Sequence, residues 1–182
     1  YYSGMTVTDS NLNTLLEKRY CLKNTLEESL VRFSLTGTTM VFSRVLAEKL
    51  LVSDEIYDLK DGHDTLLFRL NLALCGVVIY DDYSGVLFRR HDANASTGGK
   101  NIMAKIKDDF AKKYYKATSD QAKFILKHYE DDMTVANINI MNKVANYGRP
   151  LNMISIFFNQ KMKRESFIMN VVFRAKLISG FL

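Results

Sequence analysis

A histidine–aspartate pair and a lone histidine are the residues of this sequence best suited to chemistry. His63 and Asp64 precede an apolar helical pattern, and His91 follows a predicted strand. If these elements pack as one unit, all three residues lie at element ends beside a sheet, where α/β proteins place reactive groups. The Asp64 carboxylate could act as a general base, and a neutral His91 imidazole could bind a metal ion or a phosphate oxygen. Each residue also has a structural explanation: a helix N-cap for Asp64, a surface loop for His63 and a strand end for His91.

A helix and two strands are expected to position these residues. Leucines recur at helical spacing from residue 65 to residue 74, and Gly76 is expected to end that helix. The apolar run 77–80 predicts a buried strand, and residues 86–90 predict a second strand. The two adjacent aspartates between these strands fit turn chemistry.

A loop of small residues precedes this unit. Residues 36–42 predict a loop that enters a short strand, and Ser43 is expected to cap a helix over residues 44–51. Gly37 has no Cβ, so its backbone can approach a ligand closely, although a plain tight turn explains this glycine equally well. Residues 1–8, rich in Tyr, Thr and Val, predict another strand.

Three stretches of the chain follow one another in an order that is specific to a known family. They are Thr36-Gly37-Thr38-Thr39-Met40-Val41-Phe42-Ser43-Arg44; Gly62-His63-Asp64 with the leucine-rich helix and Gly76-Val77-Val78-Ile79-Tyr80; and Leu87-Phe88-Arg89-Arg90-His91 with Asn94. In order and spacing they resemble the second half of the family-two glycosyltransferases of the GT-A fold, particularly the rhamnosyltransferase-like branch. The resemblance covers about residues 1–96. It implies inverting transfer of a sugar from a nucleotide-sugar donor to a saccharide or lipid-linked acceptor, in the synthesis of cell-surface polysaccharides.

The resemblance also implies roles for individual residues. Asp64 matches the base that deprotonates the acceptor hydroxyl, and His91 matches the late histidine that helps to hold a divalent metal, Mg²⁺ or Mn²⁺, and the diphosphate. Gly37 and Thr38 match the loop that lines the substrate cleft. The substrate-binding positions also include two residues that stand next to these groups in the motifs, His63 and Arg89. The Arg89 guanidinium would steady the leaving diphosphate.

The sequence departs from the family pattern at several points. Thr65 and Leu66 follow the His-Asp pair where this branch often has aromatic residues, and Asp92 stands where a glycine is common after the late histidine. The Asp-x-Asp metal motif and the nucleotide-binding βα units of the family lie upstream of the matched region. We therefore expect an α/β fold in which residues 1–96 are the C-terminal, acceptor-side half of a GT-A domain. The missing N-terminal half would be its partner.

Composition and charge set limits on the class of protein. Hydrophobic residues make up 47% of the 182 residues and charged residues 25%, which predicts a folded chain and excludes a disordered one. No apolar run approaches the roughly 20 residues of a membrane-spanning helix. The two cysteines, Cys21 and Cys75, have no zinc-site or disulfide spacing, so both are expected to be buried thiols in a reducing compartment. The expected location is the cytoplasm, and a peripheral position on the inner face of the cell membrane stays open.

The two parts of the chain differ in charge. Residues 1–96 hold 10 basic and 13 acidic side chains, a net of −3, whereas residues 97–182 hold 15 and 7, a net of +8. We therefore expect a helical basic tail over 97–182, with helices over 102–115, 119–129 and 133–146 and another after Pro150.

The basic tail leaves alternatives open. Lys163, Arg164, Arg174 and Lys176 surround apolar residues, which suits a helix on an acidic membrane surface, while packing against the missing half explains them as well. Lysines beside Tyr114 and Tyr115 would suit nucleic acid. Lysine-rich solvated helix faces are common, so we expect no nucleic-acid partner.

Two other functions compete with glycosyl transfer. A metal-dependent phosphohydrolase could use the His-Asp pair, but it needs further His and Asp ligands on consecutive helices, and only His91 and His128 remain. A non-catalytic binding module that keeps a remnant of the fold is the other alternative.

Overall fold

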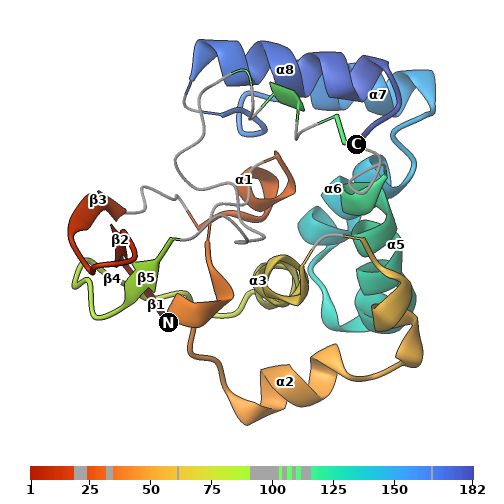
Figure 1. Cartoon of the computed structure of the whole chain (residues 1–182). Coiled ribbons are helices and arrows are strands. Elements are labelled where there is room, and N and C mark those ends of the chain that lie inside the picture. Colours follow the sequence, from red (N-terminus) through yellow and green to blue (C-terminus); the bar gives the residue numbers. More distant parts are fainter. Residues whose placement is uncertain are drawn as a thin grey trace.

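In the computed structural model, two small sheets pack with a group of helices, so the chain is a mixed α/β protein (Figure 1). It describes residues 1–18, 24–31, 35–60, 62–90, 103, 106–107, 110–111, 116–164 and 166–182. His91 and Asn94, Cys21, the tyrosine pair at 114–115 and most of the predicted helix 102–115 lie outside these ranges.

The first eight residues contribute one strand to each of the two sheets. These strands are β1 (Tyr2–Ser3) and β2 (Met5–Thr8), and their partners are β3 (Thr14–Lys18), β4 (Tyr80–Asp81) and β5 (Leu87–Arg89). β1 pairs with β4 in parallel, and β2 lies between antiparallel β3 and parallel β5. Parallel neighbours need a long crossover, and here the crossover contains the helix that follows Gly62.

That helix, α3 (His63–Ala73), lies at the centre of the molecule (Figure 1). Its predicted core residues Leu66, Leu67 and Leu70 are buried. Among the described residues, it packs mainly against α1 (Leu26–Val31), α2 (Arg44–Leu50) and α5 (Ala117–Tyr129). Burial of almost its whole circumference explains why it carries apolar residues on nearly every face.

The remaining helices confirm most of the helical pattern in the sequence. α2 begins after Ser43, whose side chain accepts a hydrogen bond from the Leu46 N–H at 3.2 Å, as an N-cap does. The predicted helices over 119–129 and 133–146 form as α5 and α6 (Val135–Ala145), and Pro150 begins α7 (Pro150–Phe158). α8 (Phe167–Ile178) packs on α7. The described residues also form the short helical turns η1 (Gly37–Thr39), η2 (Asp54–Asp58) and η4 (Glu130–Asp132).

One continuous core joins the strands and the helices. Its buried side chains come from β1, α1 and α3 and also from α5, α6, α7 and α8. Within it, Arg69 is 3% exposed, and its guanidinium donates to the Ser29 carbonyl at 3.0 Å and to Gln121 Oε1 at 2.7 Å. Gln121 Nε2 donates in turn to the Lys60 carbonyl at 3.2 Å. Residues before and after position 96 therefore share a core, and the predicted boundary at 96/97 stays a prediction.

α3 ends just before Gly76, as predicted, but two other local predictions around this point were wrong. The residue in the left-handed conformation at the helix end is Cys75, with φ of 57°. The N–H groups of Cys75 and Gly76 donate to the carbonyls of Leu72 and Asn71, which closes the helix. Cys75 is also exposed rather than buried.

The predicted buried strand over 77–80 is the second error. Only Tyr80 belongs to β4, and Val77 and Ile79 are 82% and 58% exposed. Val41 and Phe42, which follow η1, are exposed as well. The apolar run 77–80 therefore lies at the surface, whereas a strand of this composition is normally covered by other parts of the protein.

Candidate active site

The Asp64 carboxylate lies against the loop that contains Gly37. The Gly37 N–H donates to Asp64 Oδ2 at 3.1 Å, and the Thr65 N–H donates to Oδ1 at 2.8 Å. Asp64 stands in the first turn of α3, where unpaired backbone N–H groups and the helix dipole favour a negative charge. The structure thus brings together two of the predicted site residues, which are 27 positions apart in the sequence.

Two glycines surround this carboxylate. A Cβ added to Gly62 would lie 2.3 Å from Asp64 Oδ1, which is far too close for any side chain. A Cβ added to Gly37 would lie 3.4 Å from Asp64 Cβ and 3.5 Å from Oδ2, which is ordinary contact. Gly62, at the N-cap of α3, is therefore the residue that leaves room for the carboxylate. Sequence reasoning placed Gly62 in the motif but missed this role, and its one signal was a glycine at an N-cap position, where side-chain oxygens are commoner.

His63, next to Asp64, and Thr38, next to Gly37, both lie at the surface. His63 is the first residue of α3 and is exposed, and Thr38 lies in η1 and is exposed as well. The Asp64 side chain is half-buried between them and the core. Four of the predicted site residues therefore fall in one neighbourhood, where η1 meets the start of α3.

Arg89 lies on a different element. It ends β5, is exposed, and stands opposite Thr8 of β2 in the register of the three-stranded sheet. His91, the predicted metal ligand, follows two residues later, outside the described ranges. In the part of the chain that the structure describes, no three His, Cys, Asp or Glu side chains are grouped as metal ligands would be.

The predicted turn between the last two strands is formed by Asp81. Its carboxylate accepts the Tyr83 N–H at 2.9 Å and the Tyr1 hydroxyl at 2.8 Å. These two hydrogen bonds, the Tyr83 bond first, hold the pKa of Asp81 below its ordinary value. Asp81 therefore has a structural role as a turn residue, as its sequence context predicts.

An apolar hollow of about 470 Å³ lies on the strand side of α3. Its lining comes from β1, from residues 40–46, from α3 and from residues 77–78. Val41, Phe42 and Val77 in this lining are the exposed apolar residues described above. A hollow of this volume could hold a small molecule, but its apolar rim continues onto open surface, which is more typical of a protein contact.

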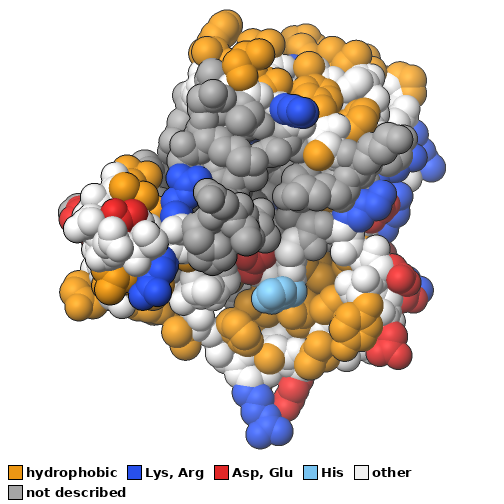
Figure 2. Space-filling model, viewed as in Figure 1, with side chains coloured by type: hydrophobic (Ala, Val, Ile, Leu, Met, Phe, Trp, Pro, Cys, Tyr) orange, Lys and Arg blue, Asp and Glu red, His pale blue; other side chains and the backbone are white. Residues whose placement is uncertain are grey.

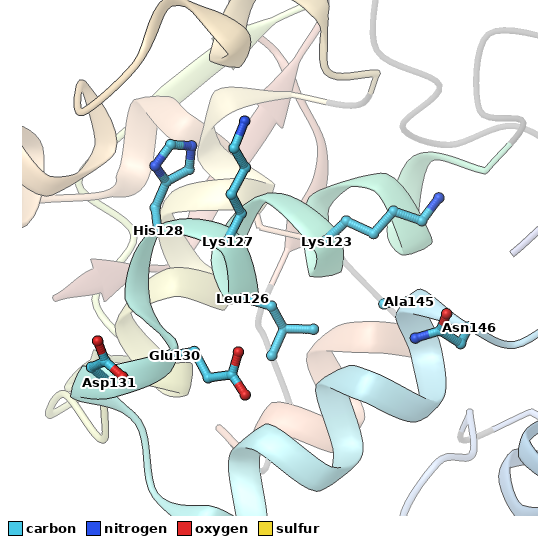
Figure 3. Close-up of a pocket in the computed structure, with 8 residues that line it drawn as sticks. All are labelled: Lys123, Leu126, Lys127, His128, Glu130, Asp131, Ala145 and Asn146. Carbon is cyan, nitrogen blue, oxygen red and sulfur yellow. The ribbon is translucent and has the colours of Figure 1, made fainter.

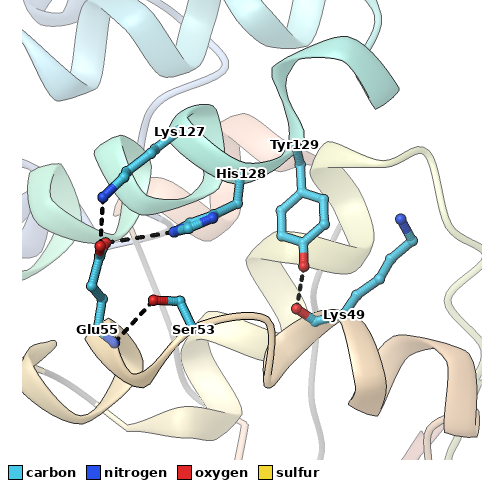
Figure 4. A network of polar contacts seen from close by, with 6 residues as sticks. All are labelled: Lys49, Ser53, Glu55, Lys127, His128 and Tyr129. Atoms are coloured by element: carbon cyan, nitrogen blue, oxygen red, sulfur yellow. Dashed lines mark hydrogen bonds and ion pairs between the residues drawn. The ribbon is translucent and has the colours of Figure 1, made fainter.

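A second hollow, of about 480 Å³, lies between α5 and α6 and is lined by charged side chains (Figure 3). Its basic groups already have carboxylate partners. Lys123 Nζ lies 3.0 Å from Asp120 Oδ1, and Lys127 and His128 both face Glu55 (Figure 4). The Lys127 hydrogen bond is the main reason why the pKa of Glu55 lies below its ordinary value. This group attaches η2 to α5 and is separate from the predicted site.

Fold and site together define a mixed α/β protein with a carboxylate that is fixed by backbone N–H groups at the start of its central helix. No protein-family model, curated protein or solved structure matches this chain.

Proposed function

We propose that this chain is the acceptor-side half of an inverting nucleotide-sugar glycosyltransferase in which Asp64 is the general base. The observation that supports this best is the contact between the Asp64 carboxylate and the Gly37 N–H at 3.1 Å. It joins two of the three motifs on which the family resemblance depends, the glycine loop and the His-Asp pair. The fold, a mixed α/β chain with parallel strand pairs, is compatible with this class.

The geometry suits the abstraction of a proton from a sugar hydroxyl. A hydroxyl is a poor nucleophile until a positioned base removes its proton. Each Asp64 oxygen accepts one backbone N–H among the described residues, so each keeps a lone pair for an incoming hydroxyl. Because both bonds come from the backbone, the carboxylate is oriented before the substrate binds, which lowers the cost of reaching the reactive geometry.

The other substrate roles follow from the exposed residues around Asp64. His63 and Thr38 stand at the surface on either side of the contact and would bind the acceptor or the donor sugar. Arg89 at the end of β5 would meet the charge of the leaving diphosphate. A divalent cation, Mg²⁺ or Mn²⁺, would supply further positive charge there, with His91 as one ligand and the rest from the donor half.

The exposed apolar strand side supports the idea of a missing donor half. Val77 and Ile79 leave an apolar edge next to β4, and the hollow beside Val41 and Phe42 continues it. In a complete domain of this class, nucleotide-binding βα units would cover that edge. The acceptor would be a saccharide or a lipid-linked saccharide, and the enzyme would work in the cytoplasm.

The test is the variant Asp64→Asn in the intact protein, assayed with nucleotide-sugar donors in the presence of Mg²⁺ or Mn²⁺. Asparagine keeps the shape and can accept one of the two backbone hydrogen bonds, but it cannot take a proton. Transfer should fall by about 10²–10⁴-fold, the usual contribution of a general base, while donor binding stays unchanged. Asp81→Asn, which alters a structural carboxylate, is the matched control and should keep its activity. Undiminished transfer by Asp64→Asn would show that Asp64 is not the general base.

A further inference from the structure

The two last helices carry apolar side chains on their outer surface as well as on their inner one. Leu151 and Phe167 are 81% and 82% exposed, and Figure 2 shows hydrophobic side chains gathered at the top of the molecule, over α7 and α8. The exposed apolar positions recur at helical spacing on each helix. The α7–α8 face consists of Leu151, Ile154, Phe158, Phe167, Ile168, Val171 and Ile178.

This outer face is not needed to hold the helices in place. The opposite side of α8 is packed into the core through Val172, Phe173 and Leu177. The Arg174 guanidinium donates to the carbonyls of Ile156 at 2.8 Å and Met162 at 3.2 Å, which joins α8 to α7. A helix that is apolar on both sides indicates a second apolar environment outside the protein.

Two of the basic residues expected at a membrane have other roles. Arg174 is used inside the protein as described, and burial lowers the pKa of its guanidinium. Arg164 Nε donates to the Val31 carbonyl at 3.0 Å. Lys161 and Lys163, in the connection between α7 and α8, stay exposed, with Lys161 Nζ 3.6 Å from Glu27.

The segment that carries the face has a strong positive net charge. Residues 133–182 contain seven basic side chains and one acidic side chain, Glu165, a net of +6. α7 and α8 themselves contain no acidic residue. A second copy of the chain would bring two such segments together, and the like charges would oppose that contact. An anionic surface would instead be attracted to them.

We propose that the α7–α8 face docks on the surface of an anionic lipid bilayer. Phe158 and Phe167 enter the boundary between headgroups and acyl chains, while Lys161 and Lys163 bind lipid phosphates. Helices suit this position because their backbone groups are already hydrogen-bonded within each helix. Among the described residues, no helix is long and apolar enough to cross a bilayer, so α7 and α8 lie along its surface. The inference is independent of the proposed function.

The test is co-sedimentation of the full chain with phosphatidylcholine vesicles, with and without phosphatidylglycerol. Binding is expected to the anionic vesicles and to weaken as salt is added, since salt screens the lysines. The double variant Leu151→Ser/Phe167→Ser should bind at least about tenfold more weakly, because two large apolar side chains no longer leave water. Replacing Lys161 and Lys163 by Gln should weaken binding by about fivefold for each charge.

Matched controls separate this result from a loss of structure. The double variant Tyr57→Ser/Val135→Ser removes two side chains that are similarly exposed, 78% and 74%, but lie away from the face, and it should bind normally. All variants should unfold at the same temperature as the parent chain, as expected for surface changes. Equal binding to vesicles with and without phosphatidylglycerol would overturn the proposal. So would the absence of vesicle binding by a parent chain that self-associates, if the Leu151→Ser/Phe167→Ser change abolished that self-association, because the face would then be a contact between copies of the chain.

Discussion

The strand side and the α7–α8 face both expose large apolar residues, but they differ in backbone and in charge. The strand side ends in a short, partly paired edge beside Val77 and Ile79, with Asp81 and Asp82 next to it. The α7–α8 face belongs to complete helices without acidic residues. An open strand edge offers hydrogen bonds that another protein segment can use, whereas helices offer only side chains. Exposed apolar residues alone therefore do not identify a partner; the backbone beneath them and the charge around them do.

The largest effect is expected from a change in the core, which tests whether the strand side and the α7–α8 face belong to one cooperative unit. Arg69→Met removes the guanidinium that joins α1 to α5 and leaves the Ser29 carbonyl and Gln121 Oε1 without their donors. The free energy of unfolding should fall by about 3 kcal/mol, still in a single transition. Urea unfolding followed by circular dichroism measures this, with the exposed Arg44→Met as control. Two separate transitions in the parent chain would mean that the regions are independent.

A second prediction concerns the candidate active site at the start of α3, and it rests on the proposed function. Gly62→Ala places a Cβ 2.3 Å from Asp64 Oδ1, so the carboxylate must turn away from the Gly37 N–H. Transfer by the intact protein should fall by about a hundredfold, since a displacement of about 1 Å can cost that much. Gly37→Ala, where the added Cβ makes ordinary contact, should retain most of the activity. Equal losses in both variants would contradict the geometry.

A smaller effect is expected where the helical tail supports α3. Asn137 of α6 donates from Nδ2 to the carbonyls of Leu72 at 3.3 Å and Ala73 at 2.8 Å, which caps the end of α3. Asn137→Ala should lower the free energy of unfolding by about 1 kcal/mol. The same change at Asn139 is the control, and chemical denaturation measures the difference.

The smallest effect concerns pH on the strand side. The pKa of Asp81 is lowered in the folded chain, so its ionised form contributes stability that is complete above the ordinary Asp pKa of 3.8. That contribution is lost as the pH falls through the lowered pKa. Carboxyl titration by NMR should find Asp81 titrating below this ordinary value, and Asp81→Asn should flatten the acid limb of the stability curve. Titration of Asp81 at or above its ordinary value would contradict the two hydrogen bonds.

Local signals made the helices predictable from the sequence. Ser43 and the leucines of α3 act within one or two turns, so α2 and α3 could be located without knowledge of the fold. The errors at Val77 and Cys75 have the opposite origin. Whether an apolar strand is buried depends on what covers it, and whether a thiol is buried depends on how the helix ends. Neither is contained in a short window of sequence.

The candidate site shows the same division. Asp64 and Gly37 were each noticed as suitable residues, but spacing gave no reason why segments 27 positions apart should touch. Only the family resemblance placed them in one cleft, and their catalytic roles stay proposals. The requirement for Gly62 could not be predicted, because it depends on the position of a carboxylate oxygen relative to a backbone two residues earlier.

The pairing of the first eight residues has a consequence for the order of folding. β1 and β2 find their parallel partners 78 to 81 positions later in the chain, so both sheets close very long loops. Closing such loops costs entropy before any hydrogen bond is gained, and contacts this distant form slowly. The helices and the β2–β3 pair are local and can form early. The N–H groups of Tyr2, Gly4 and Thr6, which donate to the distant carbonyls of Ile79, Asp81 and Val86, should therefore be among the last to acquire protection from hydrogen exchange during refolding.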